Sequence, residues 1–257
     1  MFSAKGQAVT ADSPVASLPC RVLTPENGAG GVPVLLLHTF SSNGADDWPD
    51  AGLPAALTAA GRPVYIPDLP GHGASARPGT ADSLSTSSQS AALAAVIAGM
   101  PGDSVDIVGY SLGARLAWSL ARISPRRVGH LVLGGLSPFE PFGALDMGSL
   151  TALVRDGAAP QDPLTAMIGG MITAPGRDPE SLLAVIEGLR AEPFQPDAWA
   201  PDAPVLFVRG SGDQIAAGME TLAEAVKGAR MLTVPGDHLQ VLHGSAFQQA
   251  ALDFINS

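Results

Sequence analysis

Short apolar runs recur along the chain and are separated by longer segments with a helical pattern. Each run has four or five mostly aliphatic residues bounded by Gly, Pro or polar residues, which predicts buried β-strands. We predict six strands, at residues 33–37, 63–66, 105–108, 130–133, 204–208 and 231–234. A further, antiparallel edge strand is expected within residues 15–23. Because the runs are continuous rather than alternating, the six strands should be buried on both faces of a parallel sheet.

The segments between these runs are rich in Ala and Leu. They predict helices at residues 52–60, 87–99, 112–123, 219–227 and 246–255. The alternation of strands and helices is typical of an α/β protein whose mostly parallel sheet is flanked by helices on both faces. Ligands of such sheets bind at the carboxyl ends of the strands.

One long stretch, residues 137–201, interrupts this alternation. It contains no convincing strand, and its helical patterns at 164–172 and 179–189 are separated by Gly and Pro turns. We therefore predict a helical lid at 137–201, inserted into an α/β core formed by residues 1–136 and 202–257.

Composition narrows the function classes. The 257 residues carry a formal net charge of −10 without a Lys/Arg-rich run, which argues against nucleic acid or membrane partners. Cys20 is the single cysteine, so neither a disulfide nor a CxxC metal site is expected. No secretory signal or membrane-spanning run is visible. We expect a cytoplasmic protein that acts on a small molecule without cofactor or metal; the sequence leaves the oligomeric state open.

The candidate nucleophile lies in residues 109–113, which read Gly-Tyr-Ser-Leu-Gly between a predicted strand and a predicted helix. This is the setting of the G-x-S-x-G nucleophile elbow. The tight turn strains Ser111, the glycines keep side chains away from its hydroxyl, and the helix N-terminus favours developing negative charge. The pattern predicts that Ser111 attacks the substrate.

A serine hydroxyl needs a base, and the base needs a carboxylate that orients it. Among the five histidines, His238 is favoured because it follows the last predicted strand; His243 is the alternative. Asp213 follows the strand at 204–208 and is the favoured acid, with Glu140 as its rival. Asp237, next to the histidine, is interpreted as a turn former.

The order Ser111, Asp213, His238 and the segment Asp-Leu-Pro-Gly-His-Gly-Ala-Ser at residues 68–75 resemble the α/β-hydrolase fold family over essentially the whole chain. The resemblance implies that residues 68–75 are mainly structural. It also implies an oxyanion hole made by the backbone amides of Leu112 and Phe40. Where the family has a glycine, this chain has Thr39. A β-branched residue resists the backbone angles that glycine permits, so we expect an altered loop, with the Thr39 hydroxyl a candidate substrate contact.

A serine at the elbow favours hydrolases of acyl compounds over those relatives that use Asp there. We therefore predict a serine hydrolase that cleaves a small, uncharged to moderately hydrophobic carboxylic ester or a related acyl compound. Candidate substrate-binding residues are Thr39, Tyr110, Arg115, Phe139, Phe142, Met167 and Met171.

Two alternatives remain open. The first is a C–C bond lyase or hydrolase, because residues 109–115, together with the Asp-Leu-Pro-Gly-His-Gly run, also resemble the menaquinone-pathway lyases that eliminate pyruvate. In that family arginines hold the substrate carboxylates, and Arg115 matches the arginine of its elbow motif. Nine acidic and three basic residues at 137–201 argue against a tricarboxylate substrate. The second alternative is a non-catalytic protein of this fold that binds a small molecule, an interpretation favoured by Thr39.

Overall fold

A seven-stranded sheet forms the centre of the protein, in a computed structural model that describes residues 18–26, 28, 30–77 and 79–257. The strand order is β1-β3-β2-β4-β5-β6-β7. Their bounds are β1 Cys20–Leu23, β2 Val34–Leu37, β3 Val64–Pro67, β4 Val105–Tyr110, β5 Val128–Gly134, β6 Val205–Gly210 and β7 Arg230–Val234. Only β1 runs antiparallel, against β3. The predicted α/β class and all six parallel strands are confirmed. The predicted edge strand is β1, and residues 15–17 of that prediction lie outside the described residues.

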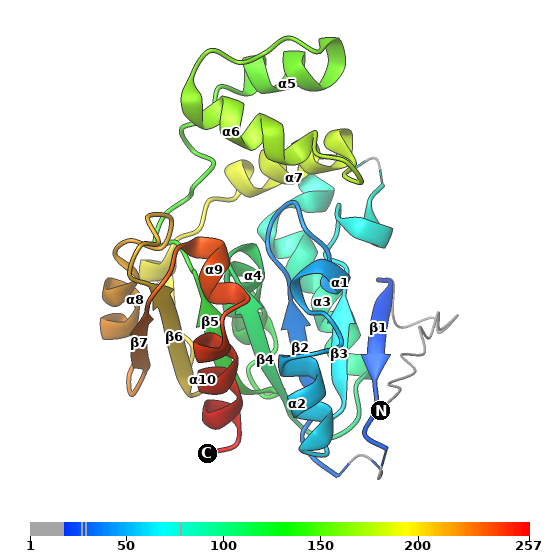
Figure 1. The fold of residues 1–257 in the computed structure, drawn as a ribbon, viewed down its shortest axis with the longest axis vertical. Coiled ribbons are helices and arrows are strands. Elements are labelled where there is room, and N and C mark those ends of the chain that lie inside the picture. The colour runs from blue at the N-terminus through cyan, green and yellow to red at the C-terminus, as the bar shows by residue number, and fades with distance from the viewer. Residues whose placement is uncertain (1–17, 27, 29, 78) are drawn as a thin grey trace.

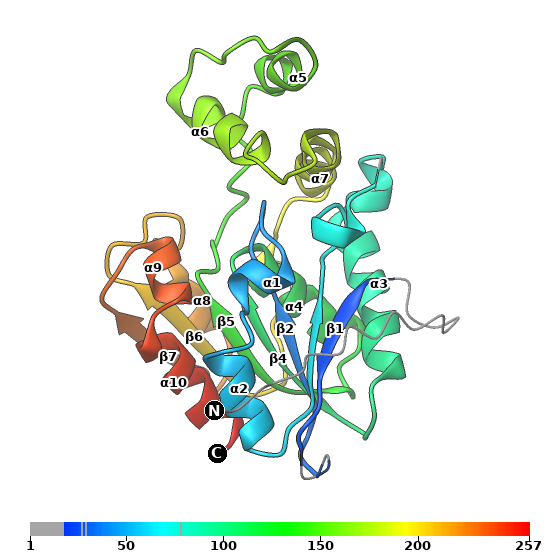
Figure 2. The same ribbon diagram turned by 45° about the vertical axis from the view of Figure 1, so that its right-hand side comes forward.

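Helices cover both faces of the sheet, as Figures 1 and 2 show. One face packs against α3 (Thr86–Gly99), α4 (Leu112–Ile123) and α8 (Met219–Ala225). The other packs against α2 (Leu53–Ala59), α9 (His238–Leu242) and α10 (Ser245–Ile255). Successive strand residues face opposite sides, so Leu35 and Leu37 belong to the first core and Val34 and Leu36 to the second. This explains the continuous apolar runs at β2 to β6. The prediction that all six parallel strands are buried on both faces is wrong for the edge strand β7, in which Val234 alone is buried.

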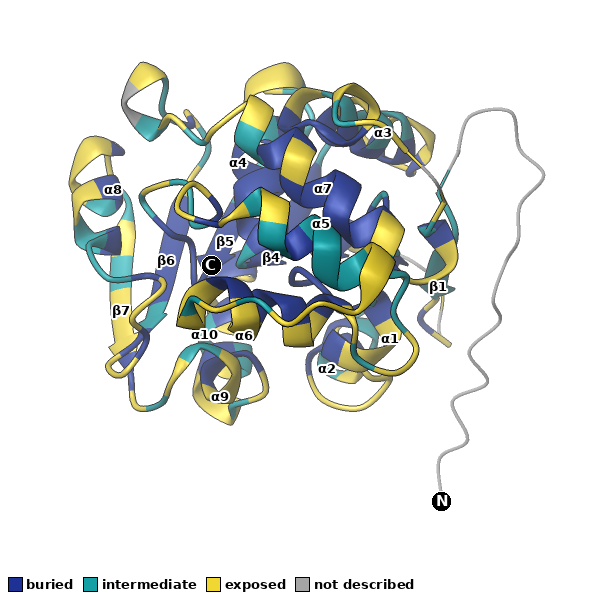
Figure 3. Cartoon of the chain, turned by 90° about the horizontal axis from the view of Figure 1, so that it is seen from above, coloured by how far each residue is buried: buried dark blue, intermediate teal, exposed yellow. Residues whose placement is uncertain are grey.

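Residues 137–201, here called the cap, connect β5 to β6 above the carboxyl edge of the sheet (Figure 1). They contain α5 (Met147–Asp156), α6 (Pro163–Ile172) and α7 (Pro179–Ala191). The helices α6 and α7 occupy the two predicted helical segments, whereas α5 was not predicted. Six buried apolar residues of α7 join the first core, and Figure 3 shows this helix lying under α5 when viewed from above.

Shorter elements complete the loops at the carboxyl edge. They are the α-helical turn α1 (Gly44–Asp47) and the 3₁₀ turns η1 (Gly73–Ser75), η2 (Asp82–Leu84) and η3 (Pro196–Ala198). Asn43 caps α1 by accepting hydrogen bonds from the amides of Ala45 and Asp46. The candidate nucleophile lies at the same edge, where β4 ends.

Candidate active site

Ser111 occupies the turn between β4 and α4. Its φ is 53° and its ψ is −112°, a strained conformation for a residue with a side chain. The turn is fixed because the Ser111 amide donates to the Gly134 carbonyl of β5, at 2.8 Å. Its position at the N-terminus of α4 gives the hydroxyl the positive end of a helix dipole.

The two flanking glycines are required by close packing. A Cβ on Gly109 would collide with the carbonyl of Gly113, and a Cβ on Gly113 would collide with the carbonyl of Leu37 in β2. The glycines thus allow the turn and β2 to approach closely. This is a backbone reason for the Gly-x-Ser-x-Gly spacing.

Asp213 lies in the loop after β6 and is buried, with a side chain that is 0% exposed. Its Oδ1 accepts hydrogen bonds from the amides of Ile215 and Ala216, at 3.0 and 3.1 Å. Its Oδ2 lies 2.8 Å from Nδ1 of His238. Burial alone would raise the pKa of Asp213, but the hydrogen bond and charge of His238 and the two amides outweigh it and hold the pKa below its ordinary value.

His238 is the first residue of α9. Asp237 caps this helix by accepting from the amides of Leu239 and Gln240, while the Gln240 side chain accepts from the Asp237 amide. Asp237 is therefore a helix cap, whereas the sequence pattern indicated a solvated residue or a turn former. This capping of α9 by Asp237 sets the direction in which the chain leaves β7, and therefore the position of the His238 ring.

The Asp213 and His238 loops are held together by backbone bonds. Ser211 donates to the Val234 carbonyl at 2.8 Å, and Gly212 donates to the Gly236 carbonyl at 2.9 Å. The His238 ring also packs edge-on against Tyr110, with ring centroids 5.4 Å apart, and Tyr110 directly precedes Ser111. The structure therefore brings the three residues of the predicted order to one edge of the sheet.

The tautomer of His238 follows from its partner. An ionised carboxylate only accepts hydrogen bonds, so Nδ1 carries the proton and Nε2 is the basic nitrogen. Within the described residues no hydrogen bond joins the Ser111 hydroxyl to this ring. Such bonds are often long before substrate binds.

The rival residues lie in other environments. Glu140 forms a buried ion pair with Arg115, so its carboxylate is committed there. His243 is the C-terminal capping residue of α9, one turn beyond His238. Neither belongs to the hydrogen-bonded pair at the end of β6 and β7.

The loop after β2 carries the second predicted oxyanion donor. The Thr39 amide donates to Asp47 Oδ2 at 2.7 Å, and the Ser42 hydroxyl donates to Asp47 Oδ1 at 2.5 Å. The amides of Phe40 and Leu112 donate to no other group of the described residues, and both residues line the same cavity. Both amides are thus available to a ligand oxygen.

Thr39, which stands where the family has a glycine, does not have a strained backbone. We expected this residue to reshape the loop, because glycine can adopt angles that threonine resists. In the described residues the positive φ of this loop falls on Ser41, at 53°, and not on Thr39. The Ser41 hydroxyl donates to the Met171 carbonyl of α6 at 2.8 Å, which ties this loop to the cap.

The segment at residues 68–75 holds two loops in place. The Asp68 carboxylate accepts from the amides of Gly44 and Ala74, at 2.8 Å each. His38 is fixed between the Thr39 carbonyl, at 2.7 Å from Nδ1, and the Leu69 amide, which donates to Nε2 at 2.9 Å. The contacts of this segment agree with the structural role that the resemblance implied.

Arg115 borders the site, but all three nitrogens of its guanidinium are engaged. Its Nε donates to the Thr86 hydroxyl at 3.2 Å, Nη1 donates to the Glu140 carboxylate, and Nη2 donates to the Glu192 carbonyl at 2.7 Å. Burial lowers its pKa, and the charge of Glu140 opposes that effect. Because these contacts occupy the guanidinium, the geometry gives no support to Arg115 as a carboxylate-binding residue.

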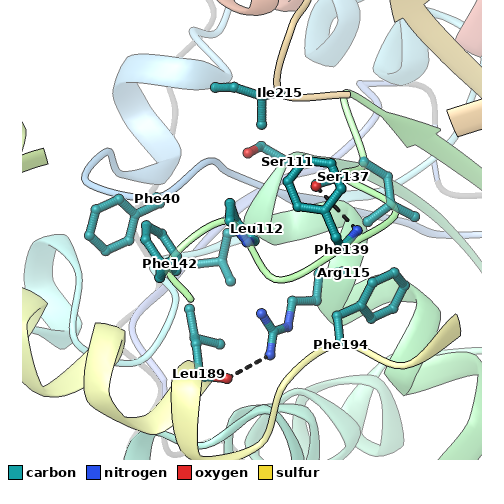
Figure 4. Close-up of a pocket in the computed structure, with 12 residues that line it drawn as sticks. Phe40, Ser111, Leu112, Arg115, Ser137, Phe139, Phe142, Leu189, Phe194 and Ile215 are labelled. Carbon is teal, nitrogen blue, oxygen red and sulfur yellow. Dashed lines mark hydrogen bonds between the residues drawn. The ribbon is translucent and has the colours of Figure 1, made fainter. Parts of the chain in front are cut away.

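A cavity of about 40 Å³ lies beside Ser111, and Figure 4 draws its lining. The lining residues are Phe40, Ser111, Leu112, Arg115, Leu136, Ser137, Phe139, Pro141, Phe142, Leu189, Phe194 and Ile215. The volume accommodates a small group, and the lining is mostly apolar. Phe40 and Phe142 pack edge-on against each other in this lining, with ring centroids 4.9 Å apart.

The predicted substrate-binding residues divide into two groups. Phe139, Phe142 and Arg115 line the cavity, whereas Thr39, Tyr110, Met167 and Met171 do not. Tyr110 is instead packed between His238 and Phe247, and the two methionines are exposed on α6.

Sequence reasoning missed six lining residues: Leu136, Ser137, Pro141, Leu189, Phe194 and Ile215. Leu136 and Ser137 follow a strand end and could have been found from the rule that ligands bind there. Leu189 and Phe194 reach the cavity through the packing of α7, for which the local sequence gives no signal.

The described part of the chain shows neither a metal-ligand cluster nor a membrane-spanning helix. It holds no group of three or more His, Cys, Asp or Glu side chains arranged for a metal ion. Within it, no helix has the length and apolar composition needed to cross a bilayer.

Comparison with known proteins identifies the fold family and one curated relative. A family model of the alpha/beta hydrolase fold matches residues 32–163, about half of the chain. The 2-hydroxy-6-oxononadienedioate/2-hydroxy-6-oxononatrienedioate hydrolase 2 of Pseudomonas putida is 35% identical over 135 residues, which cover 50% of this chain and 46% of the relative. The chain thus matches about half the length of this relative.

Solved structures resemble the whole described fold. The enol-lactonase of Burkholderia xenovorans LB400 has a TM-score of 0.72 at 20% identity, over 93% of this chain and 96% of that one. A thermophilic esterase of Thermogutta terrifontis has a TM-score of 0.70 at 20% identity, over 92% and 93%. At such identities the likeness concerns the fold alone.

Proposed function

The chain belongs to the alpha/beta hydrolase fold family, and from this premise we propose that it is a serine hydrolase that cleaves a small, uncharged carboxylic ester or a related acyl compound. The observation that carries the proposal is the His238–Asp213 hydrogen bond at the sheet edge where Ser111 forms its strained turn. The cavity lining, mostly apolar and without an unpaired charge, favours a neutral substrate.

In the proposed mechanism, Nε2 of His238 takes the Ser111 proton while the serine oxygen attacks the acyl carbon. Asp213 keeps the ring in the required tautomer and stabilises the imidazolium. The amides of Leu112 and Phe40 hold the oxyanion, and each such donor contributes about 2.7–4 kcal/mol to transition-state stabilisation. The alcohol leaves with the proton from His238, and water then cleaves the acyl-enzyme with the same base.

The test is hydrolysis of p-nitrophenyl esters with short to medium acyl chains. We expect turnover by the wild type and a loss of kcat of at least about 10³-fold in Ser111→Ala and in His238→Ala. Ser90→Ala changes a buried serine on α3 and is the matched control, with unchanged turnover. Ester hydrolysis that persists at the wild-type rate in Ser111→Ala would contradict the proposal.

The Pseudomonas putida relative supports a second candidate, hydrolysis of a dienedioate such as the one in its name. Such a substrate carries two carboxylates, and the one cationic residue among the lining residues, Arg115, is already paired with Glu140. We therefore rank this candidate second. Its test is the disappearance of 2-hydroxy-6-oxononadienedioate by chromatography; a kcat/KM above that for every ester would reverse the ranking.

A further inference from the structure

Ser137 places a second hydroxyl in the cavity, and the mechanism above does not use it. It follows β5, is 7% exposed, and lines the cavity together with Ser111 (Figure 4). Its Oγ accepts a hydrogen bond from the Phe139 amide at 3.3 Å. Within the described residues, no group accepts the Ser137 hydroxyl proton. A donor is thus left unused beside the candidate nucleophile.

Few other side chains of the cavity lining can donate a hydrogen bond to a ligand. Apart from Ser111, Ser137 and Arg115, the side chains of the lining are apolar. The guanidinium of Arg115 donates to protein oxygens through all three of its nitrogens. Among the lining side chains, Ser137 is therefore the donor, other than the nucleophile, that remains for a polar atom of the substrate.

We propose that the Ser137 hydroxyl donates a hydrogen bond to an oxygen in the acyl group of the substrate. The substrate class is then an uncharged ester whose small acyl group carries an ether, carbonyl or hydroxyl oxygen near the ester carbon. An all-carbon acyl group would displace water from Ser137 without replacing its hydrogen bond, and a buried donor left unpaired is unfavourable. This inference rests on the proposed function, and it adds a specificity-determining residue to it.

The test uses two esters of nearly the same shape, p-nitrophenyl butyrate and p-nitrophenyl methoxyacetate, which differ by a methylene group and an oxygen atom in the acyl chain. The quantity measured is the kcat/KM for the methoxyacetate divided by that for the butyrate. Comparing this ratio between variants cancels the different chemical reactivity of the two esters. We expect Ser137→Ala to lower the ratio about 5-fold, the effect of one neutral hydrogen bond.

Two further variants separate substrate contact from loop support. Ser137→Thr keeps both the hydroxyl proton and the acceptor for the Phe139 amide, so it should hold the ratio within about 2-fold of wild type. Ser181→Ala removes a fully buried hydroxyl of α7 that does not line the cavity and should leave the ratio unchanged.

A Ser137→Ala ratio equal to that of the wild type overturns the inference, whether or not the absolute rates fall. Loss of a purely structural contact would lower kcat/KM equally for the two esters and leave their ratio unchanged. Failure of the proposed function gives a different result. In that case the wild type hydrolyses neither ester and a fluorophosphonate does not label it, and both proposals are refuted together.

Discussion

Ser41 and Ser111 are the two non-glycine residues with a positive φ in the described part of the chain, and both lie at the carboxyl edge of the sheet. Each such conformation costs on the order of 1–3 kcal/mol and persists only where its surroundings enforce it. Ser111 is enforced by its bond to the Gly134 carbonyl, and Ser41 by its bond to the Met171 carbonyl. Backbone strain is therefore concentrated beside the cavity.

The first prediction concerns Gly113. In Gly113→Ala, the new methyl group would meet the carbonyl groups of Leu37 and His38, which belong to the backbone and cannot turn aside. We expect a loss of about 1–3 kcal/mol in the free energy of unfolding, measured with urea. A Cβ added at Gly170 in α6 would have no neighbouring atom within 4 Å, so Gly170→Ala should stabilise the protein by about 0.4–1 kcal/mol. A Gly113→Ala protein as stable as wild type would refute this account of the turn.

The second prediction concerns the charge of Asp213. Its folded-state pKa lies below the ordinary value because the contacts with His238 and two amides outweigh its burial. Its ionisation thus stabilises the fold above the ordinary carboxyl pKa, and this contribution is lost as the pH falls through the lowered value. Carbon-13 NMR titration should show that pKa rise in His238→Ala. An Asp213 pKa that does not move would mean that the hydrogen bond is absent in solution.

At the scale of elements, Arg115 joins the core to both ends of the cap. It leaves α4 one turn after Ser111 and contacts Glu140 near the beginning of the cap and the carbonyls of Leu189 and Glu192 at the end of α7. The Arg115 and Glu140 side chains are 5% and 11% exposed. Ser41 adds a contact from the loop after β2 to α6. The cap position is thus linked to the two loops that carry the candidate oxyanion donors.

The third prediction concerns the ion pair between Arg115 and Glu140. Arg115→Met leaves the carboxylate of Glu140 buried without its partner, which in comparable pairs costs about 3–5 kcal/mol. We expect a loss of that order in urea unfolding and faster proteolysis within the cap. The control is Arg155→Met, which breaks a pair whose side chains are 64% and 57% exposed and should cost less than about 1 kcal/mol. Equal effects of the two substitutions would argue against Arg115 as the anchor of the cap.

The elements that sequence reasoning found are those with long apolar runs or a strong helical pattern. The strands β2 to β6 fall in this class, because burial on both faces of the sheet leaves a continuous signal, and so does the helix α4, whose apolar face is buried. The edge strand β7 was also predicted, although most of it is exposed. The helix α5 was missed although its apolar residues Met147, Leu150, Leu153 and Val154 recur at helical spacing. The short helix α9 depends on the Asp237–Gln240 cap, a local pattern that was interpreted as a turn.

At the scale of the whole molecule, the candidate site combines residues that are far apart in sequence. Chain order predicted Ser111, Asp213 and His238, because each follows a strand and parallel strands end at the same edge. It could not give the contacts of Arg115 or the cavity lining, since those depend on how the cap packs over the sheet. The residue type at Thr39 predicted an altered loop, but it could not show that the positive φ of this loop falls on Ser41, whose hydroxyl contacts α6 of the cap.

The fourth prediction concerns the pH dependence of stability. His72 is buried behind Phe40, and burial together with the neighbouring His38 lowers its pKa from 6.5 to about 3. Between these values the unfolded chain binds the proton that the folded chain excludes, so stability rises with pH and is lost as pH falls from about 6.5.

Urea unfolding at pH 7 and pH 5 measures this effect. The stability that the wild type loses between the two pH values should exceed the loss in His72→Phe by on the order of 1–2 kcal/mol. The difference between pH values is compared within each protein, so a general destabilisation by the substitution cancels. Identical losses in the two proteins would show that His72 is not held neutral by the fold.

Whether Ser111 is an activated nucleophile is measured by intact-protein mass spectrometry after treatment with a fluorophosphonate. We expect a single adduct on the wild type, no adduct on Ser111→Ala, and much slower labelling of His238→Ala. Ser137 lines the same cavity and is still present in Ser111→Ala. Labelling of this variant therefore shows which of the two serines reacts. An unlabelled wild type, or an adduct that persists in Ser111→Ala, would show that Ser111 is not the activated nucleophile.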